Sequence, residues 1–188
     1  MTVSLTWGDV CIHILIAALT GIIVSFIFLR FILYFLRPRI VISPEVAIEV
    51  DGAGIHTFWF KAVNHSKWEG FELNFSAEVI SYEPAQNGCY HLKHSSIVPL
   101  VKGSFSMIPR YQSDRKIRKQ RTSAPHCFQV RTMENISHIV QDKNHFVVLH
   151  VSCKHGLSGI FKSFDQEFTH QSTIKKGNFS FGNQLVVK

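Results

Sequence analysis

The first part of the chain is almost entirely apolar. Residues 10–29 contain no Asp, Glu, Lys or Arg. In a helix, a stretch of this length matches the thickness of the hydrocarbon core of a bilayer. The pattern therefore predicts one transmembrane helix over residues 10–36, preceded by a short tail, residues 1–9. A cleaved signal peptide is the alternative, but the basic start and the small-residue cleavage site of such peptides are absent.

Beyond residue 40, hydrophobic and polar positions alternate with a period of two. In residues 71–79, five apolar side chains alternate with Glu, Asn, Ser and Glu, which is typical of a strand with one buried face. Shorter alternating runs and turn-rich separators follow the same plan, and we find no long amphipathic helix. Many short strands of this kind predict an all-β fold, an antiparallel β-sandwich or barrel, over residues 45–188. The other expected strands are 46–50, 58–62, 128–130, 147–151, 158–169 and 179–187.

The positive charge of the chain is concentrated in two places. The formal net charge is +7, and residues 1–36 contribute nothing to it because they hold one Asp and one Arg. Two of the charges lie in a basic connector, residues 37–44. A net +5 lies in residues 110–121, where six basic residues face one Asp, and flanking prolines predict a loop. The basic residues of these two segments are Arg37, Arg39, Arg110, Arg115, Lys116, Arg118, Lys119 and Arg121.

These basic side chains are the candidate binding residues. Arg37 and Arg39 follow the helix directly and are expected to contact lipid headgroups. The loop of residues 110–121 is suited to anionic lipid or an acidic protein partner, and its phosphate-binding chemistry also fits nucleic acid. Because the domain is tethered to a membrane, we expect lipid or protein rather than nucleic acid. A solvated loop without a binding role is the alternative.

The charges that flank the helix also predict its orientation. No Lys or Arg precedes the helix, whereas Arg37 and Arg39 follow it, and cytoplasmic flanks collect basic residues. We therefore expect a single-pass protein of the inner cell membrane with its C-terminal domain in the cytoplasm. The odd number of cysteines beyond the helix suits a reducing compartment.

The sequence lacks the usual signatures of catalysis. It has no nucleophile elbow, no glycine-rich phosphate loop and no suitably spaced carboxylate pair, so we expect neither an enzyme nor a cofactor. Eleven histidines nevertheless raise the question of metal binding. Two Cys-x-His pairs, Cys89 with His91 and Cys153 with His155, would supply four ligands if their hairpins met. Zinc sites usually have closer paired spacings, so we assign no metal and keep a metal-dependent enzyme as a third hypothesis.

Parts of the β region resemble a known family. Residues 58–64 (FWFKAVN) and 71–79 (FELNFSAEV) resemble the opening strands of the cytoplasmic immunoglobulin-like domain of inward-rectifier potassium channels. Residues 145–152, 159–169 and 176–182 are similar to later strands, so the resemblance covers residues 55–182. It implies an immunoglobulin-like sandwich and assembly into a ring beneath the membrane. The second helix, the pore helix and the Thr-Val-Gly-Tyr-Gly filter are absent, so it implies no potassium conduction.

Two functional hypotheses follow. The first is a membrane-anchored protein whose β-sandwich is a non-enzymatic binding and assembly module, which contacts lipid and either a protein partner or further copies of itself. The alternative is a ligand-gated membrane effector of the bacterial defence type, which oligomerises and perturbs or permeates the membrane. This alternative rests on the economy of one anchor joined to one small domain.

Overall fold

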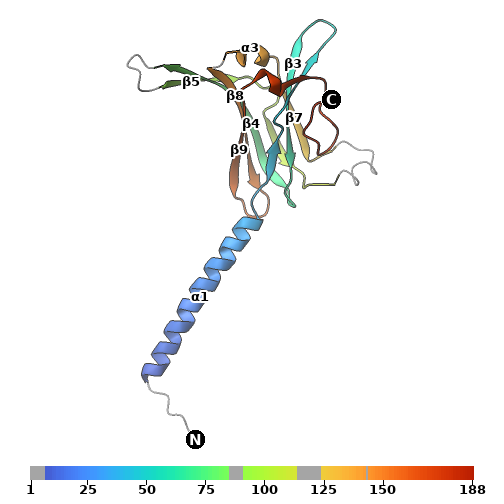
Figure 1. The fold of residues 1–188 in the computed structure, drawn as a ribbon. Coiled ribbons are helices and arrows are strands. Elements are labelled where there is room, and N and C mark those ends of the chain that lie inside the picture. The colour runs from blue at the N-terminus through green and yellow to red at the C-terminus, as the bar shows by residue number, and fades with distance from the viewer. Residues whose placement is uncertain (1–6, 85–90, 114–123, 143) are drawn as a thin grey trace. The chain divides into compact units, whose positions relative to one another are not determined.

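The computed structural model describes residues 7–84, 91–113, 124–142 and 144–188 (Figure 1). By its internal contacts the chain divides into two compact units, Met1–Arg37 and Pro38–Lys188.

The first unit is built on one helix, α1 (Trp7–Phe35), of 29 residues. Its length is about 43 Å at the usual rise per residue. Among the described residues, Val10–Phe35 is the one helical segment that is long and apolar enough to cross a membrane. The last turn closes with a hydrogen bond from Leu36 N to Ile32 O, and Pro38 then prevents the helix from continuing. The structure thus confirms one N-terminal apolar helix.

The described residues of the second unit form ten strands in two five-stranded sheets (Figure 1). The first sheet, here called sheet A, consists of β1 (Ile40–Ile42), β2 (Val46–Val50), β3 (His56–Asn64), β7 (Cys127–Thr132) and β10 (Ile174–Lys176). Within sheet A, β3 pairs with three other strands. In sheet B, β4 is central; its members are β4 (Gly70–Pro84), β5 (His91–Val98), β6 (Ser104–Ile108), β8 (His145–His155) and β9 (Phe161–Phe168).

The two sheets share one hydrophobic core. Phe58 and Phe60 of β3 have no exposed surface, and neither have Val147 and Leu149 of β8. The ring of Phe60 lies 5.4 Å from the ring of Phe168, which joins β3 of sheet A to β9 of sheet B. The predicted all-β domain after a single helix is therefore confirmed.

One strand pair contradicts the prediction of a purely antiparallel sandwich. β10 runs parallel to β2, with Ile174 opposite Val46 and Lys176 opposite Ile48. The chain reaches β10 from β9 in the other sheet, through the short 3-10 helix η1 (Gln171–Thr173). No hairpin links β2 to β10, so their direction is not restricted to antiparallel.

The basic connector contains more structure than the sequence predicts. β1 pairs with the end of β3, and Ile40 lies opposite Asn64. Ile40 and Ile42 are both buried. The β unit therefore begins at Pro38 rather than at residue 45, because these two isoleucines bury their side chains in its core.

Two predicted alternations are only partly found. In β2, Ala47 is buried although alternation with Val46 and Ile48 places it on the opposite face of the strand. Val50 is 46% exposed, since it lies beside the turn at residues 51–54. In β4, Phe71 is 37% exposed because Glu72 has a positive φ of 52° and the register with β8 shifts there. Such a bulge redirects the side chains beside it.

The two ends of the β unit carry different groups of residues. β3 runs from His56 to Asn64, and its nine residues span about 27 Å. We call the end near Asn64 the Arg39 end, because His65 N donates to Arg39 O there. At the other end lies the four-residue helix α3 (Ile136–Ile139), anchored by the buried side chain of Ile136, and we call this the α3 end (Figure 1).

Candidate functional site

At the Arg39 end, one serine joins the two basic segments of the sequence. The Oγ of Ser66 accepts a hydrogen bond from Arg39 N at 2.8 Å. The carbonyl of the same serine accepts one from Tyr111 N at 3.0 Å. Arg39 makes the first of these bonds, and Arg110 is the neighbour of Tyr111, which makes the second. Both arginine side chains are exposed. The connector after α1 and the start of the basic loop are therefore fixed side by side.

Asn64 fixes the turn that carries Ser66. Its Oδ1 accepts from Ser66 N at 2.8 Å, and its Nδ2 donates to Trp68 O at 3.1 Å and to Pro109 O at 3.0 Å. The side chain is 1% exposed, so it makes these bonds away from water, where an unmade bond would be costly. In the sequence, Asn64 stands out only as part of residues 58–64, which carry the family resemblance.

Beside this turn lies a cluster of three rings and one side-chain amide. We call it the histidine–tyrosine cluster; it is made of His65, Tyr111, His126 and Asn183. His65 stacks on Tyr111 with ring centres 5.3 Å apart, and Tyr111 meets His126 edge-on at 5.5 Å. Asn183 bonds His126 Nε2 through its Oδ1 and donates from Nδ2 to the hydroxyl of Tyr111 at 3.2 Å. This cluster connects the start of the basic loop to β3, β7 and the C-terminal segment.

The surroundings of His65 disfavour the charged form of its imidazole. Burial lowers the pKa of His65, and the positive charge of Arg39 and the proximity of His126 lower it further. His65 Nε2 is buried and has no hydrogen-bond partner among the described residues, so a proton there would find no acceptor. His65 therefore adds no positive charge at neutral pH to that of Arg39.

The lowered pKa of His65 predicts an acid-sensitive domain. A folded-state pKa below the ordinary 6.5 means that the unfolded chain binds more protons, so stability is lost as pH falls from 6.5 toward the folded value. We expect the unfolding midpoint to drop between pH 7 and pH 5.5, above the range where ordinary carboxylates titrate. Chemical unfolding of the wild type and of His65→Gln would show this, with a flatter pH dependence in the variant. Equal slopes would contradict the assignment.

A buried lysine holds the C-terminal loop, residues 180–185, against sheet A. Lys61 on β3 is 1% exposed, and its Nζ donates to Ser180 O and to Gln184 O, both at 2.7 Å. The loop is also bonded by Ser43 Oγ, which donates to Leu185 O at 2.8 Å, and by Cys127 Sγ, which donates to Gly182 O at 3.1 Å. These bonds place Asn183 where it completes the histidine–tyrosine cluster.

The structure locates only part of the predicted basic set. Arg39 and Arg110 lie at the same end of the β unit, and Arg37 is the last residue of the first unit. The remaining predicted loop residues lie outside the described residues; they are Arg115, Lys116, Arg118, Lys119 and Arg121.

The four predicted metal candidates are not brought together. His91 lies opposite Pro84 and His155 lies opposite Gly70, which are the two ends of the 15-residue β4, about 46 Å apart. Cys89 lies outside the described residues. The hairpins therefore do not meet as the metal hypothesis required. Among the described residues, no group of three or more His, Cys, Asp or Glu side chains is arranged to hold a metal ion.

Cys153 and His155 instead lie at the end of β8, where the chain turns toward β9. Burial raises the pKa of the Cys153 thiol to about 11, so it stays protonated at neutral pH. His155 Nδ1 accepts from Ser158 N at 3.2 Å and lies 3.1 Å from Ser158 Oγ. Burial also lowers the pKa of His155. These contacts stabilise a tight turn.

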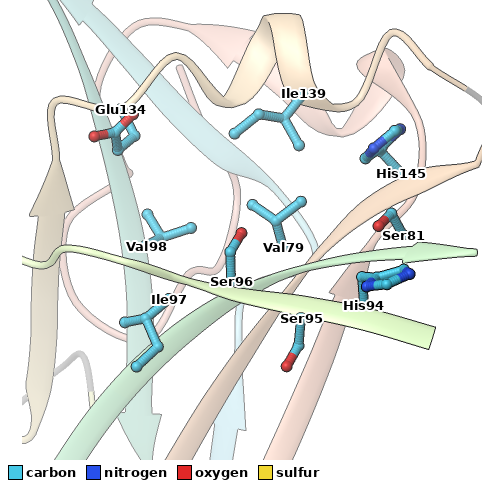
Figure 2. A pocket seen from close by; sticks show the side chains of 10 residues that line it. All are labelled: Val79, Ser81, His94, Ser95, Ser96, Ile97, Val98, Glu134, Ile139 and His145. Carbon is cyan, nitrogen blue, oxygen red and sulfur yellow. The ribbon is translucent and has the colours of Figure 1, made fainter.

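At the α3 end, a half-open pocket of about 430 Å³ lies between sheet B and α3 (Figure 2). Val79, Ser96 and Val98 lie below Ile139, while Ser95 and Ile97 point to the other face of β5 (Figure 2). The rim is polar; it includes Ser81, His94, Glu134 and His145. A wall of this mixed character suits a ligand with polar and apolar parts, but it does not select one chemistry.

No protein-family model and no curated protein matches the chain.

Proposed function

We propose that the chain is a single-pass membrane protein whose β domain is a non-enzymatic binding and assembly module, docked by its Arg39 end on anionic lipid headgroups. The observation that carries the proposal is the pair of hydrogen bonds at Ser66, which fixes Arg39 next to the start of the basic loop at Arg110. Two segments that are far apart in the sequence thus contribute charge to one surface.

The length of the connector supports lipid as the ligand. Arg39 follows Phe35, the last residue of α1, by four residues, a reach of at most about 14 Å in an extended chain. A basic side chain this close to an anionic surface is attracted to it by about 1 kcal/mol. Because Ser66 bonds both Arg39 and Tyr111, the neighbouring Arg110 shares this attraction.

The finer features of the proposal rest on the sequence. Basic residues follow the helix and none precedes it, which favours a cytoplasmic β domain at the inner cell membrane. Two sheets around a shared core agree with an immunoglobulin-like sandwich, as the resemblance to inward-rectifier cytoplasmic domains implies. That resemblance also motivates assembly into an oligomer, with a protein partner as the other route to assembly.

The docking surface can be tested in the full-length chain. In nanodiscs that contain phosphatidylserine, we expect hydrogen exchange to be slower at residues 64–68 and 109–112 than in nanodiscs of phosphatidylcholine alone. The double variant Arg39→Gln/Arg110→Gln should lose about 2 kcal/mol of docking free energy, roughly 30-fold in the docking equilibrium. Both side chains are exposed, so the fold should be retained.

The matched control removes two charges elsewhere. Lys93 and Lys175 are exposed, on β5 and β10, so Lys93→Gln/Lys175→Gln changes the net charge equally and should dock like the wild type. If exchange is the same in both lipid compositions, or if both double variants lose protection equally, the Arg39 end is not a lipid-docking surface.

A further inference from the structure

A second hollow lies at the α3 end, on the sheet A side of α3. Its volume is about 430 Å³, within the range of small-molecule sites. Ile48 of β2 and Ile174 of β10 supply its apolar surface, and both are largely withdrawn from solvent. Side chains from β3, α3, η1 and β10 surround this surface, so four separate elements shape one cavity.

The lining is basic and contains no acid. His56 of β3, His138 of α3 and Lys176 of β10 all border the hollow, and no Asp or Glu is among its described lining residues. All three are exposed, and no side-chain hydrogen bond or ion pair engages them among the described residues. By contrast, Lys175, the neighbour of Lys176 on the same strand, pairs with Glu45 at 2.9 Å. Three donors from distant parts of the sequence are thus available to one ligand.

Among the described residues, no ion pair links the carboxylates on adjoining elements to His56, His138 or Lys176. Glu49 of β2 accepts from Trp59 Nε1 at 3.1 Å, and Asp142 contacts His145 at 2.9 Å. Glu134, just before α3, borders the other pocket, shown in Figure 2. None of these acids neutralises Lys176, so the hollow presents an uncompensated positive charge.

We propose that this hollow binds a small organic phosphate. An ammonium group and two imidazoles can bind phosphate oxygens, and such charge-assisted hydrogen bonds are the stronger kind. Gln141, Gln171 and Ser137 add neutral hydrogen-bonding groups around the rim. Ile48 and Ile174 provide contact for the organic part of the ligand. The mixed pocket in Figure 2 lacks this selectivity because Glu134 borders it.

This site is independent of the lipid-docking surface. It lies at the opposite end of β3, about 27 Å from Asn64. A ligand at the α3 end therefore leaves Arg39 and Arg110 free, and each site can be tested while the other is intact.

Calorimetric titration of the full-length chain in phosphatidylcholine nanodiscs tests the proposal. The probes are inorganic phosphate, adenosine monophosphate and adenosine. We expect the monophosphate to bind more tightly than adenosine, and inorganic phosphate to compete with it. Lys176→Gln and His138→Gln should each weaken monophosphate binding about tenfold, the effect of losing one charge-assisted hydrogen bond.

The matched control is Lys175→Gln, which removes the same charge one residue away and should bind like the wild type. Unfolding midpoints of all variants should match the wild type because the substituted side chains are exposed. The proposal is overturned if neither phosphate probe binds, if adenosine binds as tightly as its monophosphate, or if Lys175→Gln weakens binding as much as Lys176→Gln.

Discussion

A Lys61→Met variant should lose about 3 kcal/mol of unfolding free energy. The substitution keeps the apolar stem but leaves the carbonyls of Ser180 and Gln184 without their donor. The bond to Ser180 is buried and the bond to Gln184 is partly buried, and an unsatisfied buried carbonyl costs about 1–3 kcal/mol. Relief from burying the ammonium offsets part of this loss. Chemical unfolding would report the change, together with faster hydrogen exchange in the C-terminal loop.

The control for this prediction is Lys93→Met on the exposed strand β5, where we expect a change within about 0.5 kcal/mol. If Lys61→Met unfolds at the wild-type midpoint and the C-terminal loop exchanges no faster, Lys61 does not anchor that loop.

A Phe168→Ala variant should be destabilised by about 3–5 kcal/mol. Phe168 has no exposed surface and its ring meets Phe60 across the two sheets, so truncation leaves a cavity in the shared core. Combining it with Phe60→Ala in a double-mutant cycle should give a coupling energy of about 0.5–1.5 kcal/mol, as for other aromatic pairs. Urea or guanidinium unfolding of the four proteins measures both quantities.

Phe161 provides the comparison within the same strand. It is 58% exposed, so Phe161→Ala should change the unfolding free energy by less than about 1 kcal/mol. Equal costs for Phe161 and Phe168, or the absence of coupling with Phe60, would show that sheets A and B do not share this contact.

The broad fold follows from local patterns. An uninterrupted apolar stretch predicts α1, and the alternation at residues 147–151 predicts β8, because burial of one face is visible in neighbouring residues. The parallel pairing of β10 with β2 is not visible locally, since it depends on where the chain returns after β9. The bulge at Glu72 escapes notice because its neighbours still alternate.

The candidate site was predicted less completely than the fold. Charge alone identifies Arg39 and Arg110 as exposed basic residues, but nothing in the sequence shows that Ser66 joins them. His126 and Asn183 are 57 residues apart, and Asn183 and Tyr111 are 72 apart, so their contacts arise only in the folded domain.

Lys61 is the clearest residue that sequence reasoning missed. The alternation of β3 directs Phe58, Phe60 and Ala62 to the core, which places Lys61 on the opposite face, where a lysine is expected in water. It is buried because the C-terminal loop covers that face. The apolar Trp59 and Val63, two residues before and after Lys61 on the same face, are the local signals that the face is covered.

The bonds of Lys61 also impose an order on synthesis of the protein. Its two acceptors, Ser180 and Gln184, lie 119 and 123 residues further along the chain. At ordinary translation rates, the ribosome adds that many residues in roughly 6 to 24 s. During this time the ammonium group must remain hydrated, so β3 cannot be fully covered on that face while the chain is growing. Completion of the domain is therefore coupled to the emergence of residues 180–185 from the ribosome, long after α1 has been synthesised.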